Sequence, residues 1–143
     1  MKVIYRCLIL AGLFASLPAL AGGEGGGVPG PRSQAIQLFS DSEDVQAAVK
    51  KWVADGYADQ SQGANMPDII TVDGKCYADP ATGSFQMCNK TYLVTRYFQK
   101  NDAESHTVAG IVTMDATQKP MFHFTFVEEG KFKDALKSFI KAP

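Results

Sequence analysis

Three segments between Thr91 and Val127 decide the fold: TYLVTRYFQ (91–99), HTVAGIVTM (106–114) and MFHFTFV (121–127). In the last segment the side chains alternate, so Phe122, Phe124 and Phe126 share one side of an extended chain. The connections, 100–105 and 115–120, are polar and contain Asn, Asp or Pro, as loops between antiparallel strands often do. The pattern therefore predicts a three-stranded antiparallel meander.

Residues 1–21 predict a signal peptide for export. Lys2 and Arg6 accompany an apolar run, Cys7–Leu17, that is too short to span a bilayer, and Ala19-Leu20-Ala21 is a small-x-small cleavage site. Cleavage would remove two of the 14 basic residues and none of the 15 acidic ones, which leaves a net charge of −3. We therefore expect a periplasmic or secreted protein with no nucleic-acid partner and no stable membrane anchor after cleavage.

The rest of the chain divides into a short tether and one domain. Residues 22–32 are rich in Gly and Pro and predict a flexible tether, because such a segment buries too little apolar surface to become ordered. Residues 33–143 have the length of a single domain. Ser40 and Glu43 have the spacing of a capping box, which predicts a helix ending near Gly56, and an apolar stripe predicts a second helix over 132–140.

Two cysteines remain after the predicted cleavage, and they predict a disulfide. Asp68–Asp73 is a strand candidate followed by an Asp73-Gly74 turn signal. A hairpin centred near Thr82 pairs residues whose numbers add to about 164, which places Cys76 opposite Cys88. In an oxidising compartment we expect these two to be joined, with a gain in stability of about 3 kcal/mol. Their spacing is not that of a C-x-x-C redox pair.

These elements together predict an α+β fold. It consists of an N-terminal helix, a curved antiparallel sheet of four to five strands with a disulfide-stapled hairpin, and a C-terminal helix. This order of elements is similar to that of cystatin-like and NTF2-like folds, in which a curved sheet wraps a helix. The similarity concerns layout alone, and folds of this kind carry unrelated functions.

A protein partner is the leading functional prediction. With symmetric loops, the meander pairs residues whose numbers add to about 205 and 235, so both faces of the sheet are apolar. If both helices pack on the triple-Phe face, the second face stays partly exposed, as interaction surfaces are. The candidate partner-facing residues on it are Leu93, Tyr97, Val108, Val112, His123 and Val127. An inhibitor, an immunity protein, an accessory subunit of a secretion system or a homodimer would fit.

Two other classes remain as alternatives. The predicted register places Met114, Met121 and His123 on one face, and thioether and imidazole ligands suit Cu(I), so a copper or small-ligand carrier is the first. An enzyme with an NTF2-like cavity near His123 is the second. The two histidines, His106 and His123, would lie about 20 Å apart along the sheet at about 3.3 Å per residue. No nucleophile with a base and no G-x-S-x-G elbow occurs, so we predict no catalytic residues and no cofactor.

Overall fold

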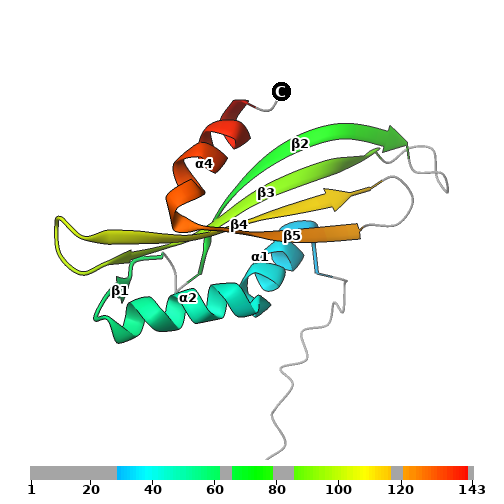
Figure 1. The fold of residues 1–143 in the computed structure, drawn as a ribbon. Helices are drawn as coiled ribbons and strands as arrows, with labels where there is room; N and C mark the ends of the chain where they lie inside the picture. The colour runs from blue at the N-terminus through cyan, green and yellow to red at the C-terminus, as the bar shows by residue number, and fades with distance from the viewer. Residues whose placement is uncertain (1–28, 62–65, 79–85, 117–120, 142–143) are drawn as a thin grey trace, which may run out of the picture.

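The computed structural model describes residues 29–61, 66–78, 86–116 and 121–141. The elements are α1 (Pro31–Asp41), α2 (Glu43–Ala54), β1 (Ala58–Asp59), β2 (Asp68–Ala78), β3 (Gln86–Gln99), β4 (Ser105–Asp115), β5 (Met121–Val127), a 3-10 turn η1 (Glu129–Lys131) and α4 (Phe132–Lys141). They form one open sheet of five antiparallel strands, with β1 and β2 on one side of β3 and β4 and then β5 on the other. The predicted α+β class is confirmed (Figure 1).

The N-terminal region contains two helices where the sequence pattern predicts one. Pro31 stands in the first turn of α1, where its fixed φ suits a helix and its missing N–H leaves no bond unmade. Ala35 and Phe39, one turn apart, are fully buried. Ser42 has extended backbone and α2 begins at Glu43, so Ser40 lies inside α1 and the predicted capping box does not form. The predicted signal peptide and residues 22–28 of the predicted tether lie outside the described residues.

The cysteine hairpin forms as predicted, with longer strands. β2 runs unbroken from Asp68 to Ala78, so the expected turn at 73–74 is wrong, and an irregularity in register between Asp73 and Cys76 replaces it. Cys76 pairs with Cys88 across the two strands, and a disulfide joins them. The predicted turn around Thr82 lies outside the described residues.

The register of β4 differs from the prediction by one residue on both sides. Val112 pairs with Tyr92 of β3 and with Phe124 of β5, so paired residue numbers add to 204 and 236. A one-residue slip turns every side chain of a strand to the opposite face, and the predicted faces of β4 are therefore wrong. In the β3–β4 connection Ser105 pairs with Gln99, one residue earlier than expected, and within this loop the Asn101 side-chain oxygen accepts hydrogen bonds from the backbone N–H groups of Ala103 and Glu104, both at 2.9 Å.

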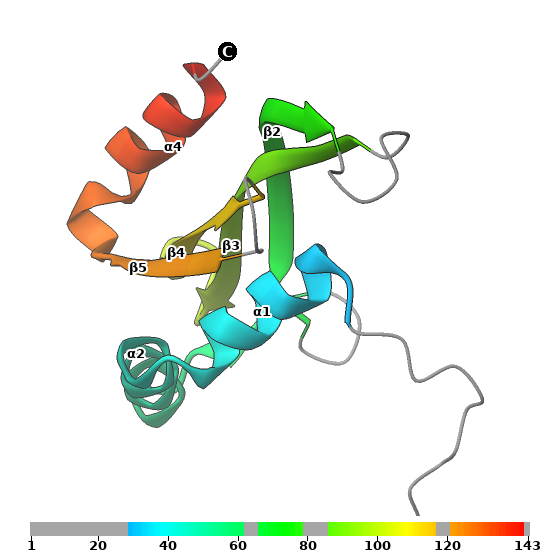
Figure 2. The same cartoon turned by 90° about the vertical axis from the view of Figure 1, so that its right-hand side faces the viewer.

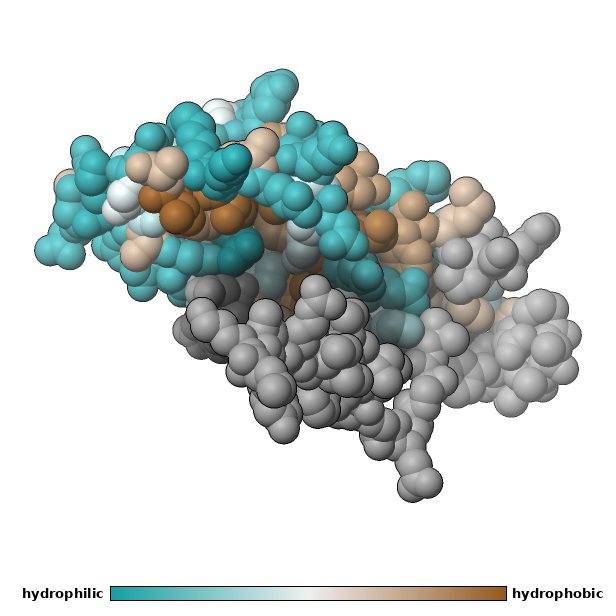
Figure 3. All heavy atoms as spheres, turned by 90° about the horizontal axis from the view of Figure 1, so that it is seen from below, coloured by the Kyte–Doolittle hydropathy of each residue, from teal (hydrophilic) through white to brown (hydrophobic). Residues whose placement is uncertain are grey.

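The helices cover both faces of the sheet (Figure 2). α1 and α2 pack on the face that carries Tyr92, Val94, Phe98, Val112 and the three phenylalanines of β5. α4 packs on the other face, over Leu93, Ala109 and Val127. Seen from the side of the helix pair, small hydrophobic areas lie among hydrophilic ones (Figure 3). In the described part of the chain, no helix is both long enough and apolar enough to cross a membrane.

Candidate functional site

β5 is the outermost strand at one margin of the sheet. It pairs with β4 from Ala109–Val127 to Asp115–Met121. Within the described ranges no second strand pairs with β5, and the backbone hydrogen bonds seen outside helices and strands do not involve residues 121–127. An edge strand of this kind presents backbone N–H and C=O groups to which a further strand can bind.

The composition of β5 leaves this edge unprotected. Proteins discourage pairing at sheet edges with charged side chains, proline, bulges or very short strands. β5 is seven residues long, follows a regular register and contains no charged residue and no proline. On the α4 side of the sheet, Met121 is 56% exposed, and His123 and Thr125 are also exposed. This edge is therefore the candidate functional site.

Aromatic packing holds β5 in place from the side of the helix pair. Phe122, Phe124 and Phe126 are half-buried against that core, and the rings of Phe39 and Phe124 meet edge to face with centroids 6.4 Å apart. Gly110 lies beneath Phe124, and a Cβ at this position would come within 2.4 Å of the ring. The close backbone approach that a glycine inside a strand indicates is thus present.

A shallow hollow borders the start of β5 on the same side. Phe122 lines it together with Leu38 and polar residues of α1, and its volume is about 240 Å³. Leu38 is 37% exposed. A strand that added to β5 would therefore find apolar surface beside the backbone groups to which it binds.

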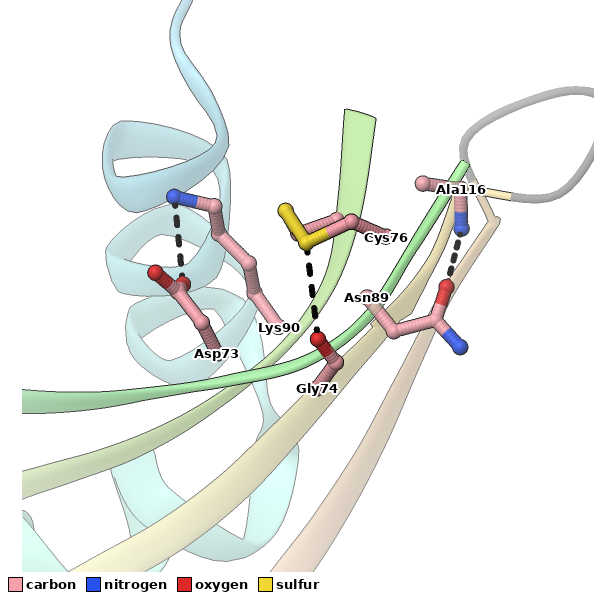
Figure 4. Close-up of a disulfide and its surroundings, with 7 residues drawn as sticks. Asp73, Gly74, Cys76, Asn89, Lys90 and Ala116 are labelled. Atoms are coloured by element: carbon pink, nitrogen blue, oxygen red, sulfur yellow. Dashed lines mark hydrogen bonds and ion pairs between the residues drawn. A yellow bond between two sulfur atoms is a disulfide. The ribbon is translucent and has the colours of Figure 1, made fainter. Parts of the chain in front are cut away.

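The opposite margin, formed by β2, carries the protection that β5 lacks. Asp68, Asp73 and Lys75 lie within the strand, and the register is broken between Asp73 and Cys76. Lys90 of β3 forms an ion pair with Asp73 at 3.4 Å, next to the disulfide (Figure 4). These charges and the irregular register oppose the addition of another strand to β2.

The other chemically distinctive cluster surrounds His106 at the far end of β4. Trp52 stacks on the imidazole with ring centroids 3.5 Å apart, and Tyr57 meets it edge on at 4.8 Å. The Glu129 carboxylate contacts His106 Nδ1. Burial raises the pKa of Tyr57, and the nearby carboxylate of Glu104 raises it further. The cluster joins α2, β4 and η1, and so anchors the start of α4 against the sheet.

The geometry of this cluster favours a structural role. A carboxylate at Nδ1 orients an imidazole as it does in acid–base catalysis, in which Nε2 would accept or donate the proton. However, the neighbouring hollow of about 680 Å³ is lined by Glu129 and not by His106, and its β4 residues are Ser105 and Thr107, which alternate with His106 and lie on the α4 face. His106 instead contacts Trp52 on the side of the helix pair. Sequence reasoning missed Glu129 and Trp52 here because neither is near His106 in the chain.

The structure separates the predicted copper ligands. Met114 is 3% exposed within the core beneath α1 and α2, whereas Met121 and His123 lie on the opposite face of β5. The slipped register of β4 explains this correction, since it turns Met114 away from the other two. The described ranges also hold no group of three or more His, Cys, Asp or Glu side chains that could hold a metal ion.

The predicted partner-facing residues do not form one surface. Val108 and Val112 belong to the core under the helix pair, and Leu93 and Val127 are buried beneath α4. Because these four are buried, they cannot contact a partner while this fold is kept. Tyr97 is 38% exposed and His123 is exposed, so both remain accessible.

Arg96 of β3 forms an ion pair with Asp59 of β1. Asp59 also accepts a hydrogen bond from the backbone N–H of Ser61 at 2.9 Å. These contacts hold the short strand β1 against β3, which accounts for the arginine structurally.

Comparison with known proteins provides no further assignment. No family model matches the chain, and no curated protein or solved structure matches it. The similarity to cystatin-like and NTF2-like folds stays one of element order, and the functional argument rests on the residues described above.

Proposed function

We propose that this chain is an exported protein, periplasmic or secreted, that binds a protein partner by accepting an extended segment as an additional strand beside β5. The observation that carries the proposal is the edge of β5, which has no charged side chain and pairs with no further strand among the described residues. The Cys76–Cys88 disulfide fits an oxidising compartment. An inhibitor, an immunity protein or an accessory subunit of a secretion system could each act in this way.

Strand addition divides the work of recognition between backbone and side chains. Backbone hydrogen bonds along the added strand provide affinity, and alternate side chains entering adjacent pockets provide specificity. Here the hollow that Leu38 and Phe122 line together with Gln34, Gln37 and Asp41 would receive a side chain of the partner. On the other face the added strand would lie beside the exposed side chains of Met121, His123 and Thr125.

The test places charges on the edge without disturbing the core. His123→Lys combined with Thr125→Lys changes two exposed positions of β5, and lysines on an edge strand oppose pairing. The matched control is Ser33→Lys with Ala47→Lys, which adds the same charge at exposed positions of α1 and α2. Tagged forms of all three chains are recovered from the host that makes the protein, and bound proteins are quantified by mass spectrometry.

We expect one protein, which is either the host's untagged copy of this chain or a different protein, to be recovered in equimolar amount with the wild type and the control, and to be lost with the β5 variant. Hydrogen exchange on the purified complex should then show slowed exchange of backbone amides within 121–127. Undiminished recovery with the β5 variant, or unchanged exchange in 121–127, would show that the partner binds elsewhere. Equal unfolding free energies of the three chains verify that the fold is intact.

A small-ligand carrier is the second candidate because an apolar hollow lies between α4 and the sheet. Val72, Ile111, Ala135 and Phe139 contribute to its lining, and its volume is about 250 Å³. Sites for drug-sized ligands are roughly 300–1,000 Å³, so only a small apolar molecule would fit. Native mass spectrometry of the protein from its host should show a bound molecule that Ala135→Phe removes. A wild-type mass without added ligand contradicts this candidate.

A further inference from the structure

We infer that the strand added to β5 is the β5 strand of a second copy of this chain. The inference rests on the proposed function and deepens it by naming the partner. In the dimer, a two-fold axis perpendicular to the sheet relates the two copies, and their sheets join into one continuous antiparallel sheet. The interface is isologous, as in most homodimers, so one strand must be complementary to itself.

The register follows from the length of β5. A two-fold axis at Phe124 is the symmetric arrangement that pairs all seven residues of 121–127 with their counterparts. It places Phe124 opposite Phe124 of the second copy, and Phe122 opposite Phe126 of the second copy. Aromatic pairs directly across antiparallel strands are favourable. The row of three phenylalanines would therefore continue through the interface as a row of six.

The charges near β5 favour the antiparallel arrangement. The strand itself has no charged side chain that would oppose a second copy. Glu128 and Glu129, which follow it directly, are each paired within the chain, Glu128 with Lys131 at 2.8 Å and Glu129 with His106. In an antiparallel pair these residues lie at opposite ends of the interface, whereas in a parallel pair they would lie beside their equivalents in the second copy. β2 differs, because Asp68, Asp73 and Lys75 and the irregular register oppose self-pairing there.

Apolar surface on both sides of β5 would be covered in the dimer. Leu38 is 37% exposed and lies beside Phe122, which the second copy would meet with Phe126. On the α4 side, Met121 would lie opposite Val127 of the second copy. The surface area that one strand pair and these neighbouring side chains bury is small compared with the standard interface of about 1,600 Å². We therefore expect a dimer whose population depends on concentration in the micromolar range.

The predicted register makes a specific charge test available. Residue 123 lies opposite residue 125 of the second copy, and both side chains are exposed. His123→Lys with Thr125→Lys places like charges opposite each other at two equivalent positions, so it should weaken dimerisation by about tenfold or more. His123→Asp with Thr125→Lys places opposite charges together at the same positions, so its dimer should form at least as well as that of the wild type.

Sedimentation equilibrium of the purified, disulfide-bonded protein over a range of concentrations measures each dimerisation constant. We expect a dimer for the wild type and the Asp/Lys variant, and a monomer for the Lys/Lys variant. Mixing the Lys/Lys variant with His123→Asp, Thr125→Asp protein should restore a dimer that contains both chains. A wild type that stays monomeric at all concentrations, or Lys/Lys and Asp/Lys variants with equal constants, overturns the inference.

The two proposals fail in different ways. If the wild type is monomeric but its recovery of another protein still depends on β5, self-pairing is wrong and strand addition by a different partner stands. If neither self-association nor recovery of a partner responds to charges on β5, both proposals are wrong. Thermal unfolding of every variant, monitored by circular dichroism, provides the folding control because both altered positions are exposed.

Discussion

The two margins of the sheet are built in opposite ways. β2 has charged residues, an irregular register and a disulfide to β3, and none of its side chains is fully buried. β5 has no charge and a regular register, and aromatic packing against Phe39 and over Gly110 holds it. Ile70 of β2 is 53% exposed, which shows how little core surrounds that strand.

The comparison shows that the contacts that hold a strand in the sheet and the features that protect its edge from pairing are independent of each other. β2 has no fully buried side chain, so its backbone pairing with β3 and the covalent link to that strand hold it, and its charges oppose pairing with other chains. β5 is firmly placed by its core contacts, yet nothing in its own sequence opposes a further strand. Of the two edge strands compared, β2 and β5, the proposal of strand addition therefore rests on β5.

The largest expected effect concerns the packing that holds β5. Phe39 is fully buried and contacts Phe124, so Phe39→Ala should lower the free energy of unfolding by about 3–5 kcal/mol through lost burial and a cavity. Phe39→Leu keeps most of the volume and should cost about half as much or less. Urea unfolding followed by Trp52 fluorescence measures both. Equal losses for the two variants would contradict a packing role for the ring.

The next effect concerns the link that holds β2. Cys76→Ala with Cys88→Ala should lower the free energy of unfolding by about 3 kcal/mol, because the cross-link no longer restricts the unfolded chain. Hydrogen exchange should become faster in β2 than in β5. Reductant should destabilise the wild type to the level of the variant and leave the variant unchanged. Equal acceleration of hydrogen exchange in β2 and β5 would show that the disulfide does not hold β2 in particular.

A smaller effect is expected at the contact beneath β5. Gly110→Ala places a methyl group against the Phe124 ring, so it should cost about 1–3 kcal/mol through overpacking. Phe124→Leu removes part of the obstructing ring. In a double-mutant cycle the two changes together should cost less than the sum of the single changes. Strict additivity would show that the strain arises somewhere else.

The smallest effect is a dependence on alkaline pH near the β2 margin. Burial raises the pKa of Tyr92 above its ordinary value of 10.0, and the Asp73 carboxylate raises it further. Above about pH 10 the unfolded chain loses this proton while the folded chain keeps it, so stability is constant below that pH and falls above it. Tyr92→Phe should reduce the fall between pH 10 and 11. An unchanged fall would assign the alkaline loss to other groups.

Local patterns predicted much of the fold. The spacing of Cys76 and Cys88 around a turn predicted their pairing, alternation predicted β5, and Gly56 ends α2 with a φ of 87°, a value that glycine adopts readily. These features depend on residues close together in the chain. α1 was missed, although Pro31 at its start and the Ala35–Phe39 spacing are the signals that could have revealed it.

The sequence revealed only one of the two features that define the candidate site. The lack of charge in β5 is visible in the sequence, but its position at an edge depends on β1 and β2 pairing with β3 instead of with β5. The expected partner surface was wrong at Val108 and Val112 because β4 is apolar on both faces, so alternation could not choose between two registers.

By itself, the sequence determined the α+β class, the meander and the disulfide, because alternation, helical spacing and turn signals act over a few residues. Only the tertiary structure decided which face each helix covers and which residues of β4 face them. A single residue of loop length turns a whole strand over, and in the β3–β4 connection Ser105 pairs with Gln99, one residue earlier than a symmetric loop would give. β5 likewise becomes an edge strand only when all five strands have paired in their final order.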